Sequence, residues 1–172
     1  GDTEDAAAFS FYANKNITTG GEGGAVSTNS REIADKIRKL SLHGITKDGW
    51  NRYKNKGKWE YDITELGYKY NMTDLSASFG LWQFKNIDKW HKRRCQIAKR
   101  YISLLSSIEG INLPTIFDGH AWHLFVIRIK LNKWKISRNE IIKILSDQGI
   151  GLAVHYKPKN KLTYYKKNYR LS

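Results

Sequence analysis

The amino-acid sequence predicts an α/β protein, because short apolar runs typical of strands alternate along the chain with segments of helical period. Ala8–Tyr12 is predicted to form a buried strand, and Ala25–Thr28 a second short strand after a glycine-containing loop. The composition changes after about residue 110. We therefore expect residues 1–110 to form one unit and residues 111–172 a separate, smaller α/β unit.

Apolar residues at helical spacing predict a helix after the second strand. Asn29 or Ser30 is a suitable N-cap, and the helix is expected to end near His43-Gly44. Residues 46–65 have no sustained period and mix glycine, tryptophan and lysine. This composition favours a long exposed loop of the kind that often carries function, and disorder would also fit.

The longest helix is predicted to begin at Thr73 or Asp74 and to continue to Leu104, with a broad apolar stripe and a kink near Asn86. Gly110 and the proline that follows it end this pattern.

The smaller unit is expected to run strand, helix, strand. Trp122–Leu131 is apolar and β-branched enough for a buried strand. Ser137 and Glu140 match a capping box, in which the hydroxyl and the carboxylate accept hydrogen bonds from free amides at a helix start. That helix is expected to end at Gly149, and Ile150–Tyr156 is predicted to form the next strand.

The 172 residues include 30 Lys and Arg against 16 Asp and Glu, which gives a net charge of +14. Such an excess is typical of proteins with an anionic partner, such as nucleic acid, a membrane surface or a phosphorylated ligand. The excess is uneven, because acidic residues dominate residues 1–30 whereas residues 155–172 carry basic charges alone. This distribution makes nucleic acid the less favoured of these partners.

A single cysteine, Cys95, excludes an internal disulfide and suits a reducing cytoplasm. No run approaches the ~18 apolar residues of a membrane span, and the five histidines show no metal-ligand spacing. We therefore expect a cytoplasmic protein without a membrane segment or a metal site. Because residue 1 opens inside sequence of structured character, we also expect the chain to be part of a longer protein.

Lys15 is the strongest candidate for chemistry, on a loop five residues after Ser10 and just before Gly20-Gly21-Glu22-Gly23-Gly24. A lysine that forms an imine must be held rigidly and must lose its proton, which burial or a nearby cation promotes. The glycines would let the backbone pass close to a flat ligand, and the Ser10 hydroxyl could meet a phosphate oxygen. By spacing alone, an ordinary surface lysine beside a glycine turn is the commoner case. A P-loop is excluded, because Lys15 precedes the glycines.

The segment Phe9-Ser10-Phe11-Tyr12-Ala13-Asn14-Lys15-Asn16-Ile17-Thr18-Thr19-Gly20-Gly21-Glu22-Gly23-Gly24 resembles the cofactor-lysine motif of the DegT/DnrJ/EryC1/StrS family of pyridoxal-phosphate-dependent sugar aminotransferases. Three further segments agree with that family in order along the chain. They are Leu42-His43-Gly44, then Leu66-Gly67-Tyr68-Lys69-Tyr70-Asn71-Met72-Thr73-Asp74, and finally His120-Ala121-Trp122-His123-Leu124-Phe125 with Val154-His155-Tyr156. The resemblance covers nearly the whole chain.

This resemblance implies the fold-type I pyridoxal-phosphate (PLP) transferase fold, an α/β architecture. Residues 1–110, with the long connecting helix, would close the large domain, and residues 111–172 would begin the small one. Lys15 matches the Schiff-base lysine, and Ser10 a ligand of the cofactor phosphate. Relatives that have histidine in place of this lysine are dehydratases, so Lys15 favours amino transfer.

Two further pairs of residues match the family's site. Lys69 and Asn71 stand in the segment that reaches across a dimer interface to the partner's cofactor phosphate. Many relatives have Asn where Lys69 stands and Arg where Asn71 stands, so which of the two makes that contact is open. His155 and Tyr156 resemble a loop that lines the sugar pocket, and a strand end with packed aromatic residues fits them about as well.

The resemblance also implies partners. Glutamate would donate the amino group, and a keto sugar on a nucleotide diphosphate would accept it, in a homodimer with shared active sites that serves cell-surface polysaccharide or secondary-metabolite sugar synthesis. The family's phosphate loop and the acid that pairs with the pyridine nitrogen precede residue 1, so we expect the 172-residue chain alone to be inactive. The alternative is a catalytically incomplete basic module that binds nucleic acid or another anionic ligand.

Overall fold

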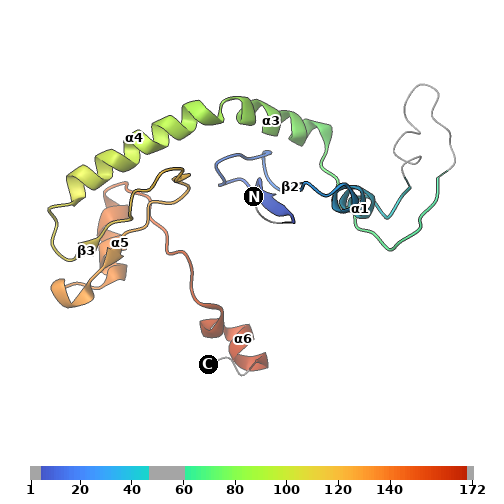
Figure 1. Cartoon of the computed structure of the whole chain (residues 1–172). Helices are drawn as coiled ribbons and strands as arrows, with labels where there is room; N and C mark the ends of the chain where they lie inside the picture. Colours follow the sequence, from blue (N-terminus) through green and yellow to red (C-terminus); the bar gives the residue numbers. More distant parts are fainter. Residues whose placement is uncertain (1–4, 47–60, 170–172) are drawn as a thin grey trace. The chain divides into compact units, whose positions relative to one another are not determined.

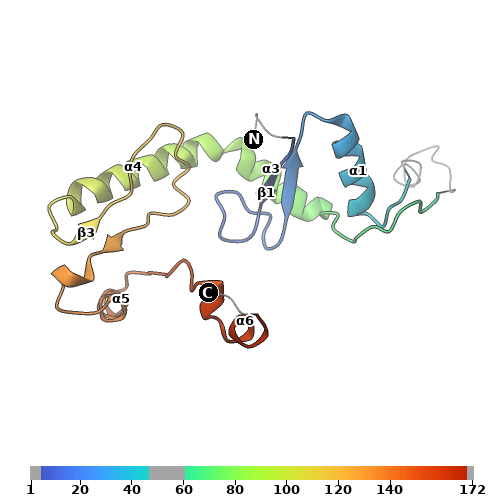
Figure 2. The same cartoon turned by 60° about the horizontal axis from the view of Figure 1, so that its bottom comes forward.

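The computed structural model describes residues 5–46 and 61–169, and the chain divides into two compact units. The first unit holds the chain up to Arg100 together with Phe117–Leu124, and the second holds Tyr101–Ile116 and the chain from Phe125 onward. Strands and helices are mixed along the chain, as Figure 1 and Figure 2 show from two directions. None of the described helices is both long and apolar enough to cross a membrane.

The first unit contains a two-stranded antiparallel sheet, β1 (Ala7–Ser10) and β2 (Gly24–Ser27), in which Ser10 lies opposite Gly24. Both predicted strands are confirmed, with β1 ending at Ser10. The prediction that Ala8–Tyr12 is buried is wrong, since the side chain of Phe9 is 50% exposed. Within the described residues this sheet has two strands, so it lacks the neighbouring strands that help to bury a central strand.

Helix α1 (Arg31–Ser41) begins where the sequence places its cap, because the Ser30 Oγ accepts a hydrogen bond from the Ile33 amide at 3.3 Å. The helix ends at a tight turn in which His43 and Gly44 have positive φ angles of 59° and 74°. The predicted end near His43-Gly44 is thus confirmed. Most of the predicted loop at 46–65 lies outside the described residues.

The long helix predicted from Thr73 or Asp74 is present as two helices, α3 (Asp74–Lys85) and α4 (Ile87–Leu105), which meet at Asn86. Thr73 is the cap of α3, since its Oγ1 accepts a hydrogen bond from the Ser76 amide at 3.2 Å. Asn86 has a non-helical φ of −107°, and its side-chain amide donates to the carbonyl of Trp82 at 2.9 Å. The predicted kink therefore falls at a residue whose side chain bonds to its own helix.

The second unit contains a short antiparallel pair, β3 (Ile111–Asn112) with β4 (Arg128–Ile129), and then a 3₁₀ turn at Leu131–Lys133. The prediction of a strand over Trp122–Leu131 is wrong for all but β4. Trp122 has a φ of 46°, which lies in the left-handed region and does not occur in a regular strand.

Helix α5 (Arg138–Asp147) confirms the predicted capping box, because the Ser137 Oγ accepts from the Glu140 amide and the Glu140 carboxylate accepts from the Ser137 amide. The strand predicted at Ile150–Tyr156 is wrong, because this exposed segment pairs with no strand among the described residues. A 3₁₀ turn at Lys159–Lys161 and α6 (Thr163–Asn168) follow it.

Two of the segments that carry the family resemblance pack against each other in the first unit. The turn after α1 meets the stretch after Glu65, where the His43 amide donates to the Tyr68 carbonyl and the Tyr68 amide donates to the Leu40 carbonyl, both at 2.7 Å. A Cβ atom on Gly67 would collide with the backbone nitrogen of Gly44. Glycine at 67 therefore allows two backbones to approach closely, and this contact fixes the start of the segment that bears Lys69.

We expect Gly67→Ala to lower the free energy of unfolding by about 1–3 kcal/mol, because the added methyl group overlaps backbone that has little freedom to move. Gly151→Ala is the matched control, since a Cβ atom there meets nothing within 4 Å. Urea unfolding of both variants and the wild type measures the difference. Equal stability of the two variants would contradict this account of Gly67.

Candidate active site

The loop that carries Lys15 connects β1 to β2, and backbone hydrogen bonds close it. The Phe11 amide donates to the Gly23 carbonyl at 2.8 Å, and the Lys15 amide donates to the Tyr12 carbonyl at 2.9 Å. The side chain of Lys15 is half-buried, and among the described residues its ammonium group has no hydrogen bond or ion pair. The loop thus fixes the main chain of Lys15 and leaves its amine without a polar partner among the described residues.

Thr19 fixes the far end of this loop. It is 3% exposed, and its hydroxyl donates a hydrogen bond to the Glu22 carbonyl at 2.9 Å. A Cβ atom on Gly23 would collide with that hydroxyl, and one on Gly80 of α3 would lie 3.0 Å from the Thr19 methyl group. The amide of Thr18 donates to the Oε1 of Gln83, also on α3, at 2.9 Å. The loop is therefore anchored to a helix as well as to the sheet.

These contacts change the interpretation of the glycine cluster. Residue 23 must be glycine because the Thr19 hydroxyl occupies the space of a side chain there. The same holds at Gly24, where an added Cβ atom would lie 2.7 Å from the carbonyl oxygen of Phe9. Packing within the protein thus accounts for both, whereas a Cβ atom on Gly20 or Gly21 would meet nothing within 4 Å. Sequence reasoning did not identify Gln83, because no pattern in the sequence links it to a loop 65 residues away.

Asn16 ties the loop to a third segment of the first unit. Its side-chain amide donates a hydrogen bond to the Ala121 carbonyl at 2.8 Å, and its own carbonyl accepts one from the Arg94 guanidinium of α4 at 3.5 Å. Next to Ala121, the amide of Trp122 donates to the Nδ1 of His120 at 2.9 Å. The residues on either side of Lys15 therefore have different environments, because Asn14 is exposed.

Ser10 stands at the end of β1, where it is exposed and its Oγ accepts a long hydrogen bond of 3.4 Å from the Tyr12 amide. Ser10 and Lys15 thus belong to one strand and the loop that follows it. No group of three or more His, Cys, Asp and Glu side chains lies close enough to hold a metal ion in the part of the chain that the structure describes.

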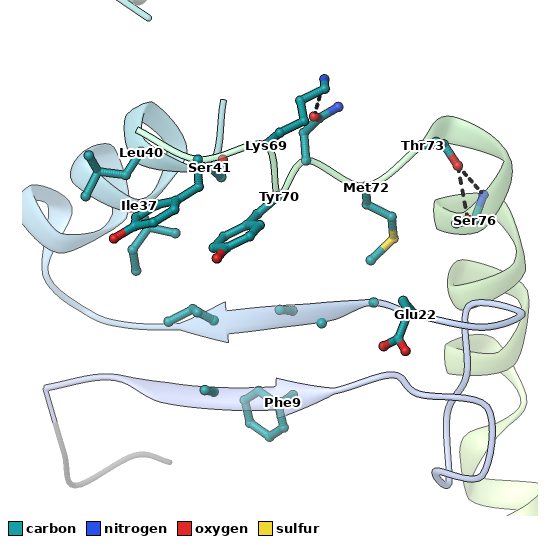
Figure 3. A pocket seen from close by; sticks show the side chains of 17 residues that line it. Phe9, Glu22, Ile37, Leu40, Ser41, Lys69, Tyr70, Met72, Thr73 and Ser76 are labelled. Carbon is teal, nitrogen blue, oxygen red and sulfur yellow. Dashed lines mark hydrogen bonds between the residues drawn. The ribbon is translucent and has the colours of Figure 1, made fainter. Parts of the chain in front are cut away.

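Lys69 and Asn71 border a groove of about 950 Å³ in the first unit. The sheet, α1 and residues 68–73 line this groove, and neither Ser10 nor Lys15 is among its lining residues. Figure 3 shows Tyr70 and Met72 pointing from the extended segment toward the sheet, while Lys69 points away from it. The Lys69 ammonium donates a hydrogen bond to the Asn71 Oδ1 at 2.6 Å, so the two side chains form one exposed polar pair.

The aromatic rings of the same segment support this arrangement. The rings of Tyr68 and Tyr70 stack with centroids 4.8 Å apart and planes 2° from parallel. Residues at i and i+2 of an extended chain share one face, so the tyrosines take one face and the pair of Lys69 and Asn71 takes the other.

Glu65 contributes the local electrostatics at the start of the segment. Its carboxylate accepts a hydrogen bond from the Lys39 ammonium at 2.9 Å and lies 3.9 Å from the Lys36 ammonium. The hydrogen bond and the attraction of Lys39, helped by Lys36, hold the pKa of Glu65 below its ordinary value of 4.5. These ion pairs join α1 to the chain that leads to Lys69.

His155 and Tyr156 lie in the second unit on an exposed segment, with ring centroids 4.3 Å apart. The structure thus brings Lys69 together with Asn71, places Ser10 and Lys15 on one strand and the loop that follows it, and pairs the rings of His155 and Tyr156.

The fold is that of the fold-type I PLP-dependent transferases, as two solved structures show. PseC of Helicobacter pylori, an aminotransferase involved in the biosynthesis of pseudoaminic acid, matches 98% of this chain with a TM-score of 0.84 and 26% identity. Spr1654 of Streptococcus pneumoniae, named as a sugar aminotransferase and solved in a PLP-form, matches 97% with a TM-score of 0.80 and 36% identity. The chain covers 43% and 42% of those structures, respectively.

The chain belongs to the DegT/DnrJ/EryC1/StrS aminotransferase family, whose model matches residues 1–172. Over 172 residues it is 46% identical to the spore coat polysaccharide biosynthesis protein SpsC of Bacillus subtilis, a match that covers 98% of this chain and 44% of SpsC. The chain therefore spans less than half the length of the relatives it matches. The resemblance inferred from the lysine motif is confirmed.

The ion pairs of Glu65 predict a specific pH dependence of stability. Because the folded-state pKa is lowered, this contribution is fully present above the ordinary value of 4.5 and is lost as the pH falls through the folded-state value. Glu65→Gln should therefore be less stable than the wild type at neutral pH, and the difference should shrink in acid.

Thermal unfolding at about pH 7 and about pH 3 measures this difference. Glu22→Gln is the control, because Glu22 has no ion pair with any other described residue. A Glu65→Gln deficit that stays constant over this range would exclude the assigned ion pairs as its cause.

Proposed function

We propose that the protein is a PLP-dependent aminotransferase that transfers an amino group from glutamate to a keto sugar carried on a nucleotide diphosphate. Membership of the aminotransferase family over the whole chain supports the reaction class. The similarity to SpsC, named for polysaccharide biosynthesis, supports a product destined for a surface polysaccharide. Spr1654 has been solved in PLP and PMP forms, which supports this cofactor for the present chain. We place the reaction in the cytoplasm.

The observation that carries this proposal is the environment of the Lys15 amine and of the loop that holds it. The amine is half-buried and makes no hydrogen bond or ion pair with the part of the chain that the structure describes, and the main chain of its loop is fixed by the sheet and by α3. Such an amine is suited to form an imine with an aldehyde, because this condensation needs an amine nitrogen held at a defined position. When bound, the cofactor supplies an aldehyde carbon and an electron-accepting ring. Lys15 would hold it through Nζ, and the same Nζ would accept and return the proton during amino transfer.

Ser10 and the pair of Lys69 and Asn71 fit the phosphate of the cofactor. A hydroxyl, an ammonium group and a side-chain amide are all donors that phosphate oxygens accept. We propose that Ser10 serves the phosphate in its own subunit, and that the pair serves the phosphate of the partner subunit in a homodimer with shared sites. The hydrogen bond between Lys69 and Asn71 supports joint action, because both groups can then turn to one anion.

This joint action also accounts for the departure from the family's usual residues. In many relatives an amide and a cation stand where Lys69 and Asn71 stand. Here the cation comes first and the amide second. Because the two positions share one face of an extended segment, the exchange keeps one cation and one amide at the same edge.

The remaining assignments concern the substrates and the domains. His155 and Tyr156 would line the pocket of the sugar, and the basic excess of the chain fits a diphosphate. We propose that residues 1–110 close the large domain and that residues 111–172 begin the small one. The 172-residue chain alone would bind the cofactor weakly and turn over no substrate.

Treatment of the complete protein with PLP and borohydride should place a pyridoxyl label on Lys15, because reduction traps the bond between the cofactor and the amine that holds it. Peptide mass spectrometry locates the label. Lys15→Ala should abolish it together with transamination, whereas Lys89→Ala, at an exposed position of α4, should retain both. Labels scattered over many lysines would refute the assignment and favour the basic-module alternative.

Lys69→Ala and Asn71→Ala should each weaken PLP binding by about 10- to 100-fold, because each removes a hydrogen bond to a charged phosphate. Fluorescence titration of the apoprotein measures the affinity. Lys89→Ala is again the control, since it removes a positive charge at an exposed site elsewhere.

Mixing subunits tests whether the site is shared. A heterodimer of Lys15→Ala and Lys69→Ala subunits contains one site with both residues intact. At a PLP concentration too low to load the weakened site of Lys69→Ala, the mixture should therefore be more active than either variant alone. Failure to regain activity, with heterodimers demonstrably formed, would mean that Lys69 serves its own subunit.

A further inference from the structure

The side chain of Asn16 makes a contact that spans 105 residues of sequence. Its Nδ2 donates to the Ala121 carbonyl at 2.8 Å, which is a short and well-formed hydrogen bond for an amide donor. Asn16 is half-buried and directly follows Lys15. The contact therefore acts on the peptide unit that carries the reactive amine.

The main chain of Lys15 is held on both sides. On its N-terminal side the Lys15 amide donates to the Tyr12 carbonyl at 2.9 Å. On its C-terminal side Asn16 is held through its side-chain amide, and through its carbonyl by the Arg94 guanidinium. Asn14 is exposed and has no side-chain hydrogen bond to any other described residue. Of the two asparagines beside Lys15, Asn16 alone anchors the loop.

The acceptor of this hydrogen bond is itself fixed. The carbonyl of His120 meets the Nε2 of His91 on α4 at 2.9 Å, and the Trp122 amide donates to the His120 ring. Trp122 is 8% exposed, and its ring stacks on that of His120 with centroids 3.9 Å apart. Ala121 therefore lies between two residues that are tied to the first unit, so its carbonyl offers a rigid anchor.

We infer that Asn16 is a positioning residue for Lys15, and this inference rests on the function proposed above. A lysine amine ends a flexible four-carbon stem, so the point it reaches depends on where its main chain is held. The hydrogen bond from Asn16 to Ala121 fixes the main chain from which the side chain of Lys15 extends. The role requires a donor at residue 16, because a carbonyl oxygen can only accept.

The test uses the complete protein and compares three substitutions of Asn16 with matched substitutions of Asn14. Asn16→Ala removes the side chain, Asn16→Asp keeps its shape but replaces the donor with an acceptor, and Asn16→Gln keeps the donor on a longer arm. The first readout is the rate of borohydride-trapped labelling of Lys15 by PLP, divided by the rate at Lys89 in the same sample. The second is kcat and KM for the amino donor.

Asn16→Ala and Asn16→Asp should slow the labelling of Lys15 about fivefold, because one hydrogen bond of ordinary net strength is lost. The same variants should lower kcat with the donor KM unchanged, and Asn16→Gln should recover part of the rate. Asn14→Ala and Asn14→Asp should match the wild type.

Wild-type labelling of Lys15 in Asn16→Asp would overturn the inference, and so would an equal loss in Asn14→Asp. Failure of the proposed function has a different signature, since wild-type Lys15 would then label no faster than Lys89.

Discussion

The buried side chain of Thr19 is the constraint on which the candidate site depends. Its hydroxyl donates a hydrogen bond to the Glu22 carbonyl. Gly23 leaves room for that hydroxyl, and Gly80 leaves room for the methyl group of Thr19. Thr19 thus helps to close the loop just before β2 and packs it against α3, together with the hydrogen bond from Thr18 to Gln83. A lysine on an unanchored glycine-rich loop would sample many positions, and ordering it for reaction would cost conformational entropy. Here that ordering is part of the fold.

A second constraint, the close approach of Gly44 and Gly67, positions the segment that carries the candidate residues Lys69 and Asn71. It lets the stretch after Glu65 run beside the end of α1, and an extended segment leaves that contact with alternating faces. The polar pair of Lys69 and Asn71 on one face, and the stacked tyrosines on the other, follow from this geometry. Glycine positions thus determine where the candidate side chains lie.

Few side chains are buried in the described residues, where Ile45, Ala98 and Trp122 are the buried hydrophobic residues. Apolar residues of the sheet and of α3, such as Phe9 and Phe79, are half exposed instead. The chain covers less than half the length of its relatives. Exposed apolar surface of this extent is typical of a face that packs against further protein, which is consistent with the homodimer proposed above.

The sequence by itself determined the features that depend on residues close together in the chain. It placed one cap at Asn29 or Ser30, one at Thr73 or Asp74 and one at Ser137, and it placed a kink near Asn86. These features were readable because each depends on a side chain that bonds a backbone group within four residues. The family motif around Lys15 was readable for the same reason, since its residues are contiguous.

Only the tertiary structure decided which segments form strands and which side chains bond to residues far along the chain. The runs Trp122–Leu131 and Ile150–Tyr156 have strand-like composition, yet a strand exists only where another segment pairs with it. Among the described residues, only Arg128–Ile129 of these runs pairs with another strand. The contacts of Asn16 with Ala121 and of Thr18 with Gln83 join residues 105 and 65 positions apart. No periodicity encodes such contacts, because the fold brings the atoms together and adjacency in sequence does not.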